Sequence, residues 1–215
     1  MNIAIDAMGG DDAPLVVVQG AVNAARKHGI PVTLVGPPDV LAAELAKLGD
    51  VPPSITVDPA EQVVEMGEHP SDVLRQKTGS SIAVGVDLVR DGKADGFVSA
   101  GNTGAVMAFA LLHLGRLPGV ERPALGSVMP TRTGRVVVLD VGANADCKPS
   151  YLVQFANMGL AYSRRVLGVA SPRVGLLNIG EEATKGSQFS LEVHGLLANS
   201  GLPFAGNVEG KDVTR

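Results

Sequence analysis

Short runs of β-branched and other apolar residues alternate along this chain with longer stretches whose apolar positions repeat at helical spacing. The short runs predict strands over residues 3–5, 32–35, 54–57, 96–98, 125–128, 136–139, 173–177 and 204–206. The longer stretches predict helices over residues 15–27, 40–48, 71–76, 82–90, 104–114, 150–167 and 187–198. Because a strand such as 136–139 is continuously apolar, as strands covered on both faces are, we predict an α/β fold with three α/β/α layers and a mostly parallel sheet.

Proline and glycine mark turns between these elements, and the sequence shows no internal repeat or Pro/Ser-rich linker. We therefore predict one α/β domain over residues 1–215. The strand at 204–206 is followed by only a few residues. A parallel strand calls for a crossover of a dozen or so residues before the next strand. We therefore expect the fold to lack a C-terminal portion.

The amino-acid composition argues against several kinds of partner and site. Aromatic residues make up only 3% and the net charge is −4, which argues against a nucleic-acid partner. The single cysteine, Cys147, forms no internal disulfide, the four histidines are scattered, and no metal site or cofactor is expected. The first residues lack a signal-peptide pattern, and no run reaches the ~18 apolar residues of a membrane span, so we expect a cytoplasmic protein.

Three predicted strands end in loops that place glycine beside Asp, Asn or Ser, namely 7–14, 99–104 and 140–148. The carboxyl ends of strands are where open α/β sheets bind ligands, and glycine lets a backbone approach a ligand closely. Candidate ligand-binding residues are Asp6, Gly9, Gly10, Asp11, Ser99, Gly101, Asn102, Thr103, Gly104, Asp140, Gly142 and Asn144.

Each loop also has a structural interpretation. Adjacent Gly9 and Gly10 do not make a dinucleotide fingerprint, and Asp11 or Asp12 could cap the helix that begins near Pro14. Loop 99–104 leads directly into an apolar helix, so it is either an anion site or an ordinary N-cap at Asn102 or Thr103. Asp140 could bind a substrate hydroxyl or hold its own loop in shape.

A fourth loop, 178–186, follows the strand at 173–177 and carries Asn178, Gly180, Glu181 and Lys185. Its Lys precedes Gly, so it is not a nucleotide-binding Walker loop. Lys185 could still bind a phosphate as a point charge, or be an ordinary surface lysine. Asn207 follows the last predicted strand. Cys147 is a candidate nucleophile, but no histidine is near it in sequence.

Residues 116–135 carry four arginines and one acid, a net charge of +3 in an acidic chain. This segment is either a solvated surface or a docking patch for an acidic partner.

Taken in order, segments 3–11, 99–104, 115–116, 122–124, 139–144, 175–182 and 206–210 resemble the bacterial phosphate acyltransferases of the PlsX family over the whole chain. The resemblance implies transfer of a fatty acyl group from acyl carrier protein to inorganic phosphate, which gives acyl phosphate for phospholipid synthesis. It implies a fold similar to isocitrate dehydrogenase and phosphate acetyltransferase, a homodimer, and peripheral membrane association through the absent C-terminal part. Lys185 matches the lysine that the family is thought to use for phosphate.

The resemblance makes Lys185 and Asn102 the candidate catalytic residues, with the N–H groups of 101–104 binding phosphate or the oxyanion. The chain departs from the family's pattern at two points. Asp12 stands where many relatives have His, and the family continues beyond Arg215 with a strand and a Gly-Phe-Thr-Gly-Asn loop. The alternatives are a non-catalytic module that binds acyl carrier or phosphate, and an NAD-dependent dehydrogenase of the same fold, which would need a dinucleotide site and an acidic metal cluster.

Overall fold

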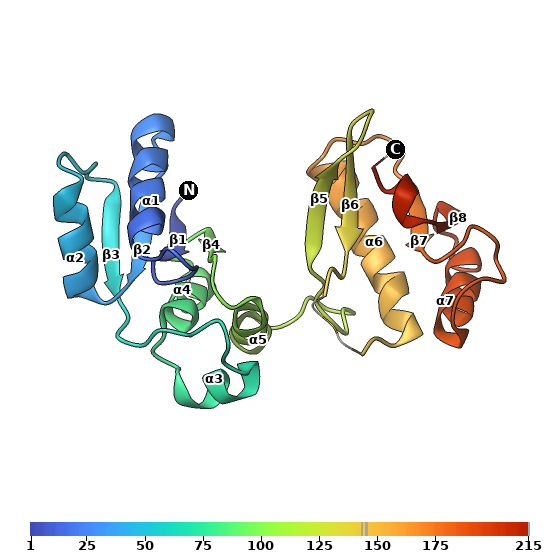
Figure 1. The fold of residues 1–215 in the computed structure, drawn as a ribbon, viewed down its shortest axis with the longest axis horizontal. Helices are drawn as coiled ribbons and strands as arrows, with labels where there is room; N and C mark the ends of the chain where they lie inside the picture. The colour runs from blue at the N-terminus through green and yellow to red at the C-terminus, as the bar shows by residue number, and fades with distance from the viewer. Residues whose placement is uncertain (143, 145, 215) are drawn as a thin grey trace. The chain divides into compact units, whose positions relative to one another are not determined.

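The computed structural model describes residues 1–142, 144 and 146–214, which group into two compact units, residues 1–116 and 117–215 (Figure 1). Each unit is described by itself. The expectation of one domain over residues 1–215 stays a prediction. None of the described helices is both long enough and apolar enough to cross a membrane.

Unit 1 is built on a four-stranded parallel sheet in the order β3-β2-β1-β4. The strands are β1 (Ile3–Asp6), β2 (Val32–Gly36), β3 (Ile55–Pro59) and β4 (Gly96–Val98). The helices are α1 (Leu15–His28), α2 (Pro38–Lys47), α3 (Pro70–Gln76), α4 (Ser81–Arg90) and α5 (Thr103–His113).

The two faces of this sheet are buried under different helices. Val32 and Leu34 of β2 pack with Val18 of α1 and Leu41 of α2. On the opposite face, Val35 and its neighbours pack with Leu88 and other residues of α4. Since successive strand residues point to opposite faces, an apolar strand such as β2 must be covered on both sides. The three-layer prediction is confirmed in unit 1.

Unit 2 contains an antiparallel pair and a parallel pair of strands. The elements are β5 (Gly126–Pro130), β6 (Arg135–Leu139), α6 (Pro149–Arg165), β7 (Val174–Leu177), α7 (Gln188–Ala198), β8 (Phe204–Val208) and a short 3₁₀ helix, Gly210–Asp212. Helix α6 lies along the β5–β6 hairpin in Figure 1, where Leu139 packs on Gly159. A core around Ala156, Val193 and Leu197 joins α6 to α7, β7 and β8.

The predicted strands and helices all form, with bounds shifted by one or two residues at most ends. One structural interpretation of loop 7–14, capping of α1 by Asp11 or Asp12, is wrong. Neither Asp11 nor Asp12 caps α1, because Pro14 occupies the N-cap position and no side chain accepts a hydrogen bond there. The antiparallel β5–β6 pairing is an exception to the otherwise parallel arrangement, since only residues 131–134 connect its strands and a crossover does not fit.

Candidate functional site

The carboxyl ends of β1 and β4 meet in unit 1, because these two strands are neighbours in a parallel sheet. Asp6 ends β1 and is only 2% exposed. Its carboxylate accepts a hydrogen bond from the Ser99 hydroxyl (Oγ–Oδ2 2.7 Å) and another from the Met8 amide (3.1 Å). The Ser99 hydroxyl in turn accepts from the amide of Gly101 (3.0 Å). Loops 7–14 and 99–104 therefore form one hydrogen-bonded network.

Gly9 makes this close approach possible. A Cβ atom at Gly9 would lie 2.5 Å from Asp6 Oδ2, 2.8 Å from the Gly101 nitrogen and 2.9 Å from Ser99 Oγ. Gly10 has φ +104°, a conformation that L side chains rarely adopt, and lies against Ala100. The two glycines predicted for a ligand contact thus have a packing role in this structure, while Asp11 is exposed.

Asn102 is the N-cap of α5 and is buried. Its side-chain oxygen accepts from the Ala105 amide (2.9 Å). Its side-chain nitrogen lies 3.3, 3.1 and 3.0 Å from the carbonyl oxygens of Glu65, Met66 and Glu68. Both ends of the Asn102 amide are therefore engaged with the protein, which favours a positioning role over direct contact with a substrate.

The first turn of α5 offers a different set of donors. No described residue accepts a hydrogen bond from the backbone N–H of Thr103 or Gly104. Such N–H groups at the start of a helix, together with the helix dipole, favour an anion. Thr103 is exposed, and Gly104 lies against Pro70, whose Cγ atom would be 2.7 Å from an added Cβ.

In unit 2, Asp140 organises the loop after β6. It has φ 60°, a left-handed conformation that is uncommon for residues other than glycine. Its Oδ1 accepts from the Asn144 amide (2.8 Å), and its Oδ2 accepts from the Cys147 thiol (3.1 Å). Asn144 also donates to the Pro123 carbonyl (3.1 Å). Gly142 has φ +89° and donates to the Asp140 carbonyl (2.8 Å).

The thiol of Cys147 is poorly suited to be a nucleophile. Burial, followed by the hydrogen bond to Asp140 and the negative charge of that carboxylate, raises the pKa of Cys147 to about 11, although the nearby Arg122 opposes the shift. A reactive cysteine needs the opposite, a pKa lowered by a cationic neighbour or a helix N-terminus. The sequence argument against a catalytic thiol is therefore supported.

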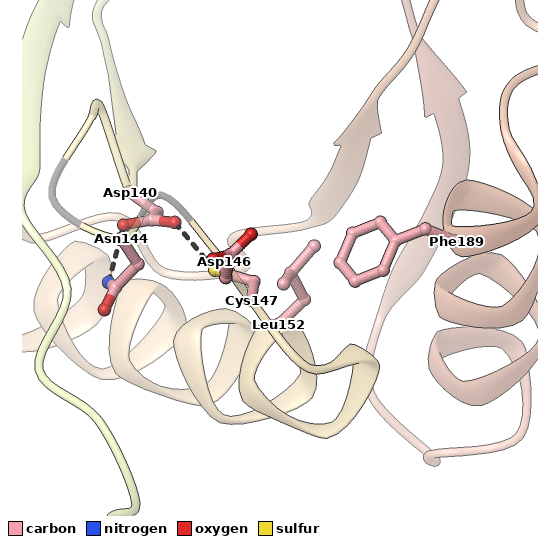
Figure 2. A pocket seen from close by; sticks show the side chains of 6 residues that line it. All are labelled: Asp140, Asn144, Asp146, Cys147, Leu152 and Phe189. Carbon is pink, nitrogen blue, oxygen red and sulfur yellow. Dashed lines mark hydrogen bonds between the residues drawn. The ribbon is translucent and has the colours of Figure 1, made fainter.

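A pocket of about 400 Å³ lies beside this loop, and its lining residues are Asp140, Asn144, Asp146, Cys147, Leu152 and Phe189 (Figure 2). Leu152 of α6 lies between the cysteine and the ring of Phe189, which comes from α7. Both helices begin beside the carboxyl ends of strands, so the cavity lies where an α/β fold usually binds its ligand. The sequence analysis missed Leu152 and Phe189, because apolar residues in a helix are indistinguishable from core positions.

The loop after β7 carries Lys185, which is exposed and forms no ion pair with any described residue. Asn178, at its start, accepts from the Ile179 amide (2.8 Å) and donates to the Lys185 carbonyl (3.0 Å). Gly180 lies under the Lys185 side chain, whose Cγ would be 3.0 Å from an added Cβ. Glu181 is exposed, 3.8 Å from Lys211.

Asn207, the penultimate residue of β8, contacts the same loop. It is 6% exposed, and its side-chain nitrogen donates to the Glu182 carbonyl (2.8 Å). The structure thus brings together Asp6, Ser99, Gly9 and Gly101 in unit 1. In unit 2 it forms one group around Asp140 and another around Asn178, Lys185 and Asn207.

Two other sequence arguments concern histidine and metals. His69 Nδ1 lies 2.8 Å from the Ser71 hydroxyl, a pair that sequence analysis did not anticipate. This contact is at the exposed start of α3, where His69 is the N-cap. Within residues 1–142, 144 and 146–214, no group of three or more His, Cys, Asp or Glu side chains could hold a metal ion.

The architecture is that of an α/β protein with the phosphotransacetylase fold. It resembles the EutD phosphotransacetylase from Staphylococcus aureus with a TM-score of 0.66 and 20% sequence identity, covering 97% of this chain and 68% of that chain. At this level of identity the likeness concerns the fold alone.

The sequence itself defines the family. The family described as "Fatty acid synthesis protein" matches residues 1–215, and this chain belongs to it. The chain is 50% identical over 213 residues to the phosphate acyltransferase of Geobacter sulfurreducens and 53% identical over 216 residues to that of Myxococcus xanthus. Each match covers 99% of this chain, but 62% and 61% of the relative's length. The resemblance to phosphate acyltransferases is confirmed, and the chain spans about three fifths of their length.

Proposed function

We propose that this chain carries out, or forms the larger part of an enzyme that carries out, transfer of a fatty acyl group from acyl carrier protein to inorganic phosphate. The observation that carries the proposal is family membership over the whole chain, together with a lysine in the loop after β7 that forms no ion pair with any described residue. Homodimer formation, and peripheral membrane association through a C-terminal part, belong to the same proposal and rest on the family resemblance.

The reaction needs no protein nucleophile. A phosphate oxygen attacks the carbonyl carbon of the thioester, and a C–O bond forms as the carbonyl oxygen becomes an oxyanion. The C–S bond then breaks, which gives acyl phosphate and a thiolate that takes up a proton. A protonated Cys147 bonded to Asp140 is compatible with this chemistry, because the thiol has no part in it.

We assign two roles to the described residues. Lys185 binds phosphate as a point charge and holds it against the electrophilic carbonyl carbon of the thioester. In unit 1, the N–H groups of Thr103 and Gly104 bind an anion, either phosphate or the oxyanion, while Asn102 holds that helix terminus in place. The dehydrogenase alternative is not proposed, because neither a dinucleotide fingerprint in 7–14 nor a described acidic metal cluster supports it.

The experiment is the incorporation of labelled inorganic phosphate into an organic-extractable product, with acylated carrier protein as donor. This chain is compared with the same chain joined to the C-terminal part of the Geobacter sulfurreducens relative. Product from both supports the proposal with a site complete in residues 1–215. Product from the joined chain alone supports the enzyme assignment and makes this chain by itself inactive. Product from neither contradicts the proposal.

A further inference from the structure

Strand β8 contains an irregularity directly before Asn207. Val174 of β7 pairs with Phe204, but the next residue, Gly175, pairs with Gly206, so Ala205 is an extra residue in β8. Gly206 has φ +100°, in the region that favours glycine. A bulge of this kind interrupts the alternation of side chains along a strand and turns the following side chain to a new direction. The residue that is turned here is Asn207.

The Asn207 side chain is directed inward and towards the loop after β7. It is 94% buried, and its nitrogen donates to the Glu182 carbonyl at 2.8 Å. Its oxygen is buried with no hydrogen-bond partner among the described residues. A buried, half-satisfied amide does not favour stability, so the fold tolerates a cost to keep this donor in place.

The carbonyl that Asn207 holds is the one that fixes Lys185. The Lys185 amide donates to the same Glu182 oxygen at 3.0 Å. The Lys185 carbonyl accepts from the Asn178 side chain, also at 3.0 Å. Gly186, with φ +100°, passes so close to Asn178 that an added Cβ would lie 2.6 Å from its oxygen. Two asparagines, Asn178 directly after β7 and Asn207 within β8, therefore hold the backbone on both sides of the lysine.

We propose that Asn207 is a positioning residue for Lys185, aimed by the β8 bulge at the Glu182 carbonyl so that the lysine is presented to phosphate from a fixed backbone. This inference rests on the proposed role of Lys185. Direct binding of substrate by Asn207 is disfavoured, because its nitrogen is already bonded and its oxygen is buried.

The test uses Asn207→Asp, which keeps the size of the side chain, replaces the donor with an oxygen facing the Glu182 carbonyl and introduces an acidic group at this buried position. The control is Asn199→Asp in the same unit, where the exposed Asn199 amide donates to the Gly195 carbonyl at the same length (2.8 Å) but far from Lys185 in sequence. Two quantities are measured on the 215-residue chain: hydrogen exchange of the Lys185 amide, and the Kd of labelled inorganic phosphate by equilibrium dialysis. The core amide of Val193 in α7 is the internal standard for unit stability.

We expect Asn207→Asp to speed exchange of the Lys185 amide roughly 3- to 10-fold, the factor of one net hydrogen bond, and to weaken phosphate binding by a similar factor. Exchange at Val193 stays unchanged, and Asn199→Asp changes neither quantity. Parent-like exchange and phosphate affinity in Asn207→Asp would overturn the inference. If Lys185→Ala binds phosphate as the parent does, the phosphate role of Lys185 fails, and the exchange rate alone then decides whether Asn207 holds the loop.

Discussion

The hydroxyl of Ser99 donates a hydrogen bond to the buried carboxylate of Asp6, with 2.7 Å between Oγ and Oδ2. The two residues are 93 positions apart in sequence, yet each directly follows or ends a strand of the same parallel pair. The bond fixes the loop after β4 on the loop after β1, and the Gly101 amide completes the network. Removing any one of these hydrogen bonds should therefore disturb the backbone at the start of α5.

Replacing Ser99 with alanine leaves Oδ2 of the buried Asp6 carboxylate without its donor and the Gly101 amide without its acceptor, while the Met8 amide still donates to Oδ1. We expect the free energy of unfolding to fall by about 1–3 kcal/mol, measured by urea denaturation. Ser171→Ala is the control, because Ser171 is an exposed loop residue. Equal stability of the two variants would contradict the network.

Gly9 and Gly20 should respond to alanine in opposite directions. At Gly9 the new Cβ would lie 2.5 Å from Asp6 Oδ2, so the loop must move and the thermal midpoint should fall. At Gly20, in the exposed interior of α1, nothing lies within 4 Å. Alanine there should stabilise the helix by roughly 0.5–1 kcal/mol. A rise in the thermal midpoint of Gly9→Ala would contradict the close packing of Gly9 against Asp6.

The substitution Asn102→Asp separates the two roles of this side chain, which caps α5 and donates to three backbone carbonyls. The aspartate keeps an oxygen for the Ala105 amide and so retains the helix cap. It loses the donor that serves the carbonyls of Glu65, Met66 and Glu68. We expect faster amide exchange at the start of α3, downstream of the released turn, with little change in the middle of α5. Loss of protection confined to α5 would mean that capping is the only task.

Cys147 should be slow to alkylate. A pKa of about 11, against an ordinary 9.0, leaves about a hundredfold less thiolate at pH 8, so iodoacetamide should react with a midpoint near pH 11. Because folding raises this pKa, the stabilisation is complete below pH 9 and is lost as the pH rises from 9 through 11. Asp140→Asn removes a charge that raises the pKa and should lower the midpoint. An alkylation midpoint at or below pH 9 in the parent chain would contradict the hydrogen-bonded environment described for the Cys147 thiol.

The order and type of the elements followed from sequence because the apolar pattern of each segment is local. The strands at 32–35 and 96–98 and the helix at 82–90 each show their period without reference to the rest of the chain. The β5–β6 hairpin shows the limit of this approach. Both strands were predicted, but their antiparallel pairing depends on the short connection at 131–134.

The roles of the site residues could not be predicted from the sequence, for a physical reason. An amide such as Asn102 or Asn207 is equally suited to a ligand and to a backbone carbonyl, and only the fold shows which partner it has. The bulge that turns Asn207 inward depends on the register between β7 and β8. Leu152 and Phe189 line a cavity only because α6 and α7 begin beside the loop after β6.

The most direct measurement is the transfer of labelled phosphate to acyl product in the chain joined to its relative's C-terminal part, with Lys185→Ala beside Lys27→Ala. Lys27 is an exposed lysine near the end of α1 and controls for the loss of one surface charge. The account predicts a loss on the order of 10²–10³ in rate for Lys185→Ala, typical of removing one group that stabilises charge in the transition state, and parent-like turnover for Lys27→Ala. Near-parent turnover in Lys185→Ala would contradict the assignment of phosphate to this loop.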